Sequence, residues 1–173
     1  MNNRGFTKKE TVLIISLTIF FLGISLMNLK KATKNKQLDN QVKVMNEDFE
    51  AFRKISMLQK KRGAVWIGPD EYLFKTYSSL GENMADPDAG TIVESRPLMH
   101  EIRNLKSGVA YGFDISRHRV EFDPRGLSSN ISGNRLDIVL WPVNLNAEDN
   151  CFVVYPMRTE IGRMADEKTC KPR

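Results

Sequence analysis

Residues 12–29 read VLIISLTIFFLGISLMNL, an almost unbroken apolar run close to the start of the sequence. No charged residue lies from Thr11 to Met27. As a helix these residues would be about 26 Å long, close to the ~30 Å hydrocarbon core of a bilayer. The run is apolar on all sides, which argues against a buried helix of a soluble protein, and no A-x-A-like cleavage site follows it. It therefore predicts a retained single-pass membrane helix.

Positive charge is concentrated on the two flanks of this run. Residues 1–36 carry seven basic side chains and one acidic, a net charge of +6, whereas residues 37–173 carry 19 basic and 20 acidic, a net charge of −1. Nucleic-acid binding by a domain needs a basic surface on that domain, which the composition of residues 37–173 does not indicate. The basic flanks suit lipid headgroups instead. Because both flanks are basic, the positive-inside rule alone does not set the orientation.

A second helical pattern follows the apolar run. Apolar residues recur at steps of four and three, which is one face of a helix, at Leu38, Val42, Met45, Phe49, Phe52 and Ile55. No Pro or Gly interrupts residues 24–62, and Gly63 follows three basic residues, as expected at a helix C-terminus. We expect one helix from about Thr7 to Arg62, roughly 84 Å long, whose second half packs on the chain's own head rather than forming a coiled-coil stalk.

From Ala64 onward, turn signals alternate with short runs of strand character. Strands are predicted at residues 109–115, 119–123, 135–141 and 152–155, in an antiparallel meander. Residues 72–99 give no clear pattern, and residues 98–105 are compatible with a short helix. The predicted fold class is α+β: a long N-terminal helix, membrane-spanning in its first half, packed on a small antiparallel β-sheet head.

Groups that could support catalysis or bind a metal are scarce. His100 and His118 are the only histidines, and His100-Glu101 lacks the second His that a zinc-protease helix needs. Asp86 and Asp88 resemble part of a calcium loop, but two carboxylates flanking a proline are far more often a turn. No phosphate-binding loop, nucleophile elbow or zinc-type cysteine spacing is present. The sequence predicts no enzyme, no cofactor and no metal.

Cys151 and Cys170 are the only two cysteines, and both lie near the C-terminus. In an exported head they would form a disulfide, worth about 3 kcal/mol in the chain-entropy model. The alternative is two reduced thiols in a cytosolic domain. The sequence thus predicts a disulfide if the head is exported and two reduced thiols if it is cytosolic.

The order Gly5-Phe6-Thr7-x-x-Glu10, followed by an apolar helix, resembles the class III signal sequence of type IV prepilins and type II secretion pseudopilins. In the head, residues 120–126 and 159–163 resemble elements of the minor pseudopilin H and FimT-like families. The resemblance implies a pilin-like fold. Its parts would be a prepilin leader (1–5), a transmembrane and fibre-core helix (6–29), an amphipathic continuation of the helix (30–62) and a periplasmic or extracellular β-rich head (63–173).

The resemblance also implies roles for three N-terminal residues. A prepilin peptidase would cut after Gly5, whose missing Cβ allows close approach, and would then N-methylate Phe6. Glu10 would serve assembly by pairing with a positive N-terminus, within the subunit or from its neighbour. The alternative for Glu10 is an ordinary interfacial carboxylate paired with Lys8 or Lys9.

Lys8 and Lys9 depart from the family pattern, in which these two positions are usually apolar. Before assembly both ammonium groups can reach the cytoplasmic headgroups. In a fibre core, two desolvated cations per subunit would be costly. We therefore expect a low-copy, tip or initiating subunit.

The function implied is that of a structural minor pilin or pseudopilin, assembled into a type II secretion pseudopilus or a type IV pilus. Expected partners are other pilin or pseudopilin subunits, the prepilin peptidase, and the inner-membrane assembly platform with its ATPase. The chain would be a single-pass inner-membrane protein with a cytoplasmic N-terminus.

Two alternatives remain open. One is a DNA-binding minor pilin for DNA uptake, and the other is a generic single-pass membrane protein with an exported binding domain. Two features of the sequence weigh against DNA binding. Ala165 stands where the FimT-like GRxR element has its second arginine, and Asp166 and Glu167 offset the basic tail.

Overall fold

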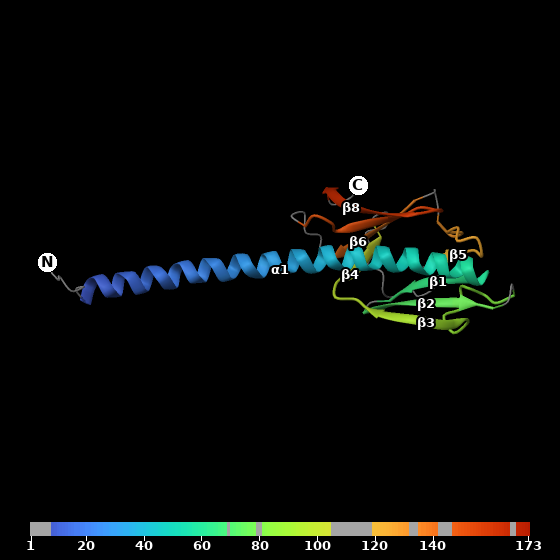
Figure 1. The fold of residues 1–173 in the computed structure, drawn as a ribbon, viewed down its shortest axis with the longest axis horizontal. Coiled ribbons are helices and arrows are strands. Elements are labelled where there is room, and N and C mark those ends of the chain that lie inside the picture. Colours follow the sequence, from blue (N-terminus) through green and yellow to red (C-terminus); the bar gives the residue numbers. More distant parts are fainter. Residues whose placement is uncertain are drawn as a thin grey trace.

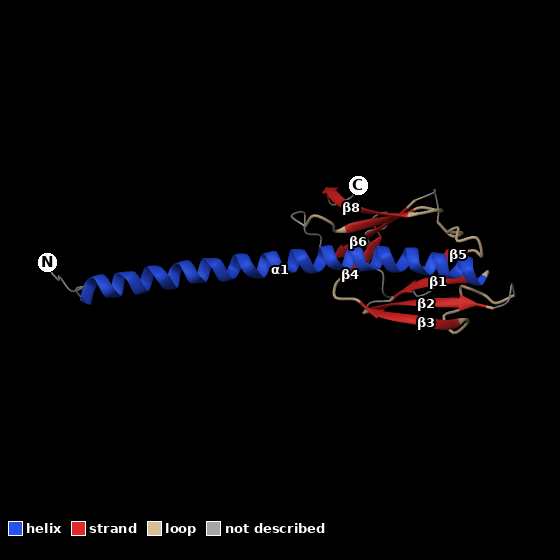
Figure 2. Cartoon of the chain, viewed as in Figure 1, coloured by secondary structure: helices blue, strands red, loops and turns tan. Residues whose placement is uncertain are grey.

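The computed structural model describes residues 8–68, 70–78, 81–104, 119–131, 135–141, 147–166 and 169–173. One long helix, α1 (Lys8–Gln59), precedes all the described strands. Its N-terminal half projects away from the head, and its C-terminal half runs between two antiparallel sheets (Figures 1 and 2). The chain therefore has the predicted α+β layout, with the long helix starting and ending within three residues of the expected bounds.

The first sheet has the strand order β3-β2-β1-β5 and the second has the order β4-β6-β7-β8-β9. The strands of the first sheet are β1 (Arg62–Ile67), β2 (Glu71–Tyr77), β3 (Thr91–Pro97) and β5 (Arg119–Phe122). Those of the second are β4 (Glu101–Asn104), β6 (Leu136–Trp141), β7 (Cys151–Val154), β8 (Thr159–Asp166) and β9 (Thr169–Pro172). All described pairings are antiparallel.

Three of the four predicted strands are confirmed as β5, β6 and β7. The fourth, residues 109–115, lies outside the described residues. The short helix at 98–105 is wrong, because β4 pairs with β6 there and fully buries Ile102 opposite Leu140. Only one apolar side chain in β4 faces the core, so four residues carry too little pattern to reveal a strand.

The expected single meander is also wrong, because the strands divide between two sheets. The chain leaves the first sheet after β3 and enters the second at β4. β5 then returns to the first sheet, and β6 lies again in the second. A helix with a wide buried face is covered better by two sheets than by one, since each sheet covers one flank.

The helix ends differently from the prediction. Gly63 was expected to stop it, but α1 ends at Gln59 and Lys60 takes the left-handed backbone conformation, with φ 52°. Gly63 instead lies in β1 against the helix. A Cβ there would come within 2.7 Å of Ser56 Oγ and 2.9 Å of the Phe52 ring. Glycine at this position allows β1 to pack closely on the last turns of α1.

The amphipathic stripe on α1 is confirmed over most of its length. The residues Leu38, Val42, Met45, Phe49 and Phe52 are all buried. The stripe ends at Ser56, which is fully buried, whereas Ile55 is only partly so. The last turn of the helix therefore presents a small side chain to β1 rather than the expected isoleucine.

Aromatic rings connect the helix to both sheets. The Phe49 ring lies 6.5 Å from Phe74 of β2 and 5.2 Å from Phe152 of β7, both in edge-to-face geometry. Phe52 adds a contact of 6.1 Å to Phe122 of β5. Because these rings belong to different sheets, the helix is the shared core of the head.

We predict that Phe49→Ala lowers the free energy of unfolding by about 3–5 kcal/mol, since it removes a buried ring that touches both sheets. Urea unfolding of the detergent-solubilised full chain measures the effect. Leu58→Ala is the matched control on the same helix, because its side chain is 83% exposed and it should cost less than about 0.5 kcal/mol. Equal losses for the two variants would contradict the position of Phe49 in the core.

Candidate functional site

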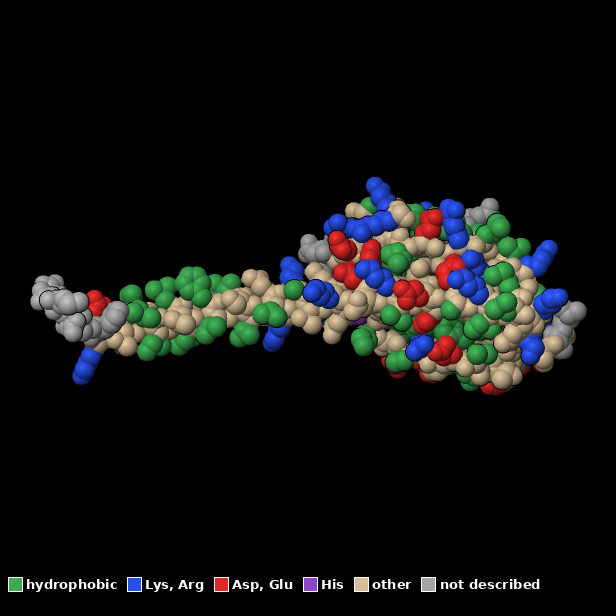
Figure 3. Space-filling view, viewed as in Figure 1, with side chains coloured by type: hydrophobic (Ala, Val, Ile, Leu, Met, Phe, Trp, Pro, Cys, Tyr) green, Lys and Arg blue, Asp and Glu red, His purple; other side chains and the backbone are tan. Residues whose placement is uncertain are grey.

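The projecting half of α1 is the most unusual surface of the molecule. Its large apolar side chains from Val12 to Leu29 are each between 45% and 67% exposed wherever the structure describes them. Figure 3 shows them along the whole projecting part, with Lys and Arg side chains near both of its ends. Among the described residues this is the one helix long and apolar enough to cross a membrane. An apolar surface of this size needs a cover from outside the chain, such as lipid or other helices.

The predicted processing residues Gly5 and Phe6 lie outside the described residues. Glu10 lies in the first turn of α1 with an exposed side chain, where the N-terminal helix dipole favours a carboxylate. Lys8 and Lys9, also exposed, lie in the same turn. The assembly role of Glu10 stays a prediction.

Cys151 and Cys170 form a disulfide with a Cα–Cα distance of 6.1 Å. They belong to β7 and β9, which are not neighbours, so the bond passes over β8 between them. Gly162 of β8 lies beneath it, and a Cβ there would sit 2.8 Å from Cys170 Sγ. Both cysteines are buried in a small apolar cluster on the outer face of the second sheet, with Val139, Val153 and Met164. The disulfide therefore fastens the C-terminal strand to the sheet.

We predict that reducing this disulfide lowers the free energy of unfolding by about 3 kcal/mol, because a closed loop with a sequence separation of 19 is opened in the unfolded chain. Urea unfolding with and without reductant measures the change. The double variant Cys151→Ala, Cys170→Ala is the control, since its stability should not respond to reductant. An equal response of both proteins would show that the loss is unrelated to this bond.

Asp86 and Asp88 form a turn around Pro87. The Asp86 carboxylate accepts a hydrogen bond from the Asp88 backbone N–H at 2.9 Å. The ammonium group of Lys75, which is almost fully buried, donates to the carbonyl oxygens of Pro87 and Ala89. A side-chain cation thus occupies the inside of this loop. Among the described residues no group of three or more His, Cys, Asp or Glu side chains is placed to hold a metal.

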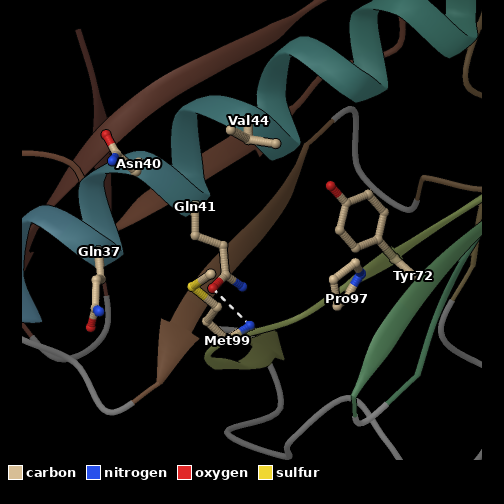
Figure 4. A pocket seen from close by; sticks show the side chains of 7 residues that line it. All are labelled: Gln37, Asn40, Gln41, Val44, Tyr72, Pro97 and Met99. Atoms are coloured by element: carbon tan, nitrogen blue, oxygen red, sulfur yellow. Dashed lines mark hydrogen bonds between the residues drawn. The ribbon is translucent and has the colours of Figure 1, made fainter.

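A groove of about 240 Å³ lies between α1, near the point where the helix enters the head, and the end of β3. Its helix wall consists of Gln37, Asn40, Gln41 and Val44, and its other wall of Tyr72, Pro97 and Met99 (Figure 4).

Gln41 joins the two walls of the groove. Its Oε1 accepts a hydrogen bond from the Met99 N–H at 3.1 Å (Figure 4), and its Nε2 donates to the His100 carbonyl at 3.2 Å. Gln41 as a whole is 8% exposed. Sequence reasoning missed this residue, although a polar side chain one turn after Leu38, beside the apolar stripe, is a signal of a buried hydrogen bond.

The side chains that line the groove do not change protonation state near neutral pH. Burial, and then the hydrogen bond to Asp48, raises the pKa of Tyr72, so the phenol remains protonated and donates to Asp48 Oδ2 at 2.6 Å. The other lining side chains are amides and apolar groups. Nearby, burial and then the charge of Lys34 lower the pKa of His100, which keeps that ring neutral. The groove therefore presents uncharged amide, phenol and apolar groups. His118 lies outside the described residues.

The C-terminal tail is basic but partly neutralised. Arg163 of β8 lies opposite Lys171 of β9 in the strand register. Arg173 reaches Asp149 at 3.6 Å, and Asp149 also pairs with Lys43 of α1 at 3.4 Å. This ion-pair cluster attaches the end of the chain to the helix where α1 enters the head.

No protein-family model matches this chain, and no curated protein or solved structure is significantly similar to it. The fold and its surfaces define an α+β protein with one long apolar N-terminal helix and two small antiparallel sheets. The helix is compatible with a single membrane crossing.

Proposed function

We propose that this protein is a structural subunit of the pilin class, a minor pilin or pseudopilin without catalytic activity. The observation that carries the proposal is the division of α1. The first half exposes apolar side chains on every side, while the second half is the core of the head. Because the head is built around α1, it is held rigidly to the projecting part of the same helix. This part carries the apolar residues from Val12 to Leu29, and we call it the shaft.

The continuity of α1 supports a mechanical role. Its 52 residues include no proline, and Gly23 is the only glycine among them. A force on the head is therefore transmitted to the shaft without a hinge. The shaft has two suitable environments, the bilayer and a bundle of similar helices. Transfer from one to the other, driven by an assembly ATPase and its platform, is the step that builds a fibre.

The N-terminal charges support a subunit present in few copies. Lys8 and Lys9 lie beside Glu10 in the first turn, and all three side chains are exposed. In the membrane these groups lie at the cytoplasmic headgroups. In a fibre core a single carboxylate can be neutralised by a neighbour's N-terminus, but two extra ammonium groups would remain to be desolvated.

We predict that the mature chain begins at N-methylated Phe6 in cells that contain a prepilin peptidase, and at Met1 in cells that lack it. Intact-mass and N-terminal analysis of the protein from its native membrane measures this. Gly5→Leu is the control, because its added side chain should block the close approach of the protease and preserve Met1. A chain that starts at Met1 in both strains would contradict the pilin class and favour an anchored exported domain.

We predict that replacing Lys8 by Leu and Lys9 by Ile raises the number of copies per fibre, since it removes two cations that oppose burial in the core. Quantitative mass spectrometry of purified fibres measures the stoichiometry. Lys30→Leu with Lys31→Ile is the matched control, because it removes the same charge at the other end of the apolar run. Unchanged stoichiometry for the Lys8 and Lys9 variant would contradict the low-copy explanation.

A further inference from the structure

One face of α1 stays open where the helix crosses the head. Its residues follow steps of four and three along the helix, and all are exposed: Asn40, Val44, Glu47, Ala51, Lys54 and Leu58. We call this set the open stripe. Figure 2 shows the head part of α1 uncovered on the viewer's side, with the sheets along its flanks. Apolar and small residues recur in the open stripe every seven positions, at Val44, Ala51 and Leu58.

Three acidic residues on the flanks of this half of α1 bind other residues of the head. Asp39 accepts the Asp149 N–H at 2.9 Å, Asp48 accepts the Tyr72 hydroxyl, and Glu50 binds Arg53 at 2.6 Å and the Thr159 N–H at 2.8 Å. The side chains of these three acids thus form contacts within the chain.

Glu47 and Lys54, in contrast, form no hydrogen bond or ion pair with any residue that the structure describes. They lie seven residues apart on the helix, which is about 10.5 Å along its axis, too far for a direct pair. The same face thus carries one unmatched anion and one unmatched cation, separated by one heptad.

We propose that the open stripe binds the open stripe of a second copy of this chain, parallel to it and displaced by one heptad. Glu47 of one copy then lies beside Lys54 of the other. The same displacement places Val44 against Ala51 and Ala51 against Leu58, so that a larger side chain always meets a small one. Small residues at such positions allow two helices to approach closely.

Other arrangements of two copies fail on charge or on direction. In register, Glu47 would face Glu47 and Lys54 would face Lys54, and like charges at such positions repel. An antiparallel pair would place the two apolar shafts at opposite ends, which two copies anchored in one membrane cannot do. The proposed displacement rests on the proposed function, because it requires one copy to be drawn about 10.5 Å further out of the membrane than its neighbour.

The open stripe therefore sets the axial displacement between two copies during assembly. Two copies at equal depth in the bilayer repel each other, and extraction of one copy by a single heptad brings the opposite charges together. The displaced copy also brings its own Gln37 level with Val44 of the first, at the edge of the groove lined by Gln41 and Met99. Two copies are sufficient for this contact, so it agrees with a low-copy subunit.

Cysteine cross-linking in the native cell tests the proposal. Two tagged full-length copies are produced together, one with Val44→Cys and the other with Ala51→Cys, and a mild oxidant is added. We expect a 44–51 adduct that clearly exceeds the 51–51 adduct of two Ala51→Cys copies. A dominant 51–51 adduct, a 44 to 58 adduct between Val44→Cys and Leu58→Cys copies, or an adduct of Val44→Cys with a different protein would each overturn it.

Charge reversal supplies the second arm. Glu47→Lys or Lys54→Glu alone should reduce the 44–51 adduct about twofold to fivefold, the effect of a partly exposed ion pair. The double variant with both reversals should restore it, because the pair then re-forms with exchanged signs. Glu50→Lys is not a suitable control, since Glu50 binds the head. Lys60→Glu changes charge at an exposed residue outside the open stripe and should leave the adduct unchanged. Failure of the double variant to recover would also overturn the proposal.

N-terminal analysis of the same samples distinguishes a failure of the heptad contact from a failure of the proposed pilin class. A chain that begins at methylated Phe6 but forms no 44–51 adduct would retain the pilin class and remove the heptad contact. A chain that keeps Met1 yet forms the adduct would remove the pilin class and retain a contact between copies.

Discussion

The packing of one helical face between two sheets is the constraint on which the head depends. Phe49 touches Phe74 in one sheet and Phe152 in the other, and Phe52 adds Phe122. Without the helix each sheet would expose the apolar face that it now buries, and small sheets of four or five strands need such a cover. Because the same helix continues into the projecting shaft, the orientation of the head is set by its own core. The apolar projecting half of α1 and the folded head are therefore connected by one uninterrupted helix.

The polar contacts around this core have a consistent distribution. Those on the flanks of α1 attach it to the head: Asp39 and Lys43 to the loop at Asp149, Asp48 to Tyr72, and Glu50 to the start of β8. The disulfide between Cys151 and Cys170 fastens β9, and Arg173 at the end of the chain returns to Asp149. The open stripe remains outside this system. None of the polar contacts of the described residues named above involves the open stripe, and this is why we propose it as a contact between chains.

Local pattern predicted the elements whose signal is strong. The apolar run and the stripe from Leu38 to Phe52 defined the helix, and alternation defined β5, β6 and β7. The failures have common causes. β4 is four residues long with one core-facing side chain, and Lys60 ends the helix in a conformation that glycine was expected to adopt. β2 and β3 were not predicted from the sequence. β2 is buried on both faces along much of its length, while all of β3 is exposed. Neither pattern alternates, so periodicity does not reveal them.

By itself the sequence determined the long helix, its apolar first half, its buried face and the presence of two cysteines close enough in the chain to pair. These features are local, since hydrophobicity and helical spacing require no knowledge of distant residues. Only the tertiary structure decided that two sheets rather than one enclose the helix, that Gln41 and Lys75 are buried with backbone partners, and that Glu47 and Lys54 are not matched within the described head. These outcomes depend on which flank of the helix each sheet covers, and that is decided by packing between residues far apart in the chain.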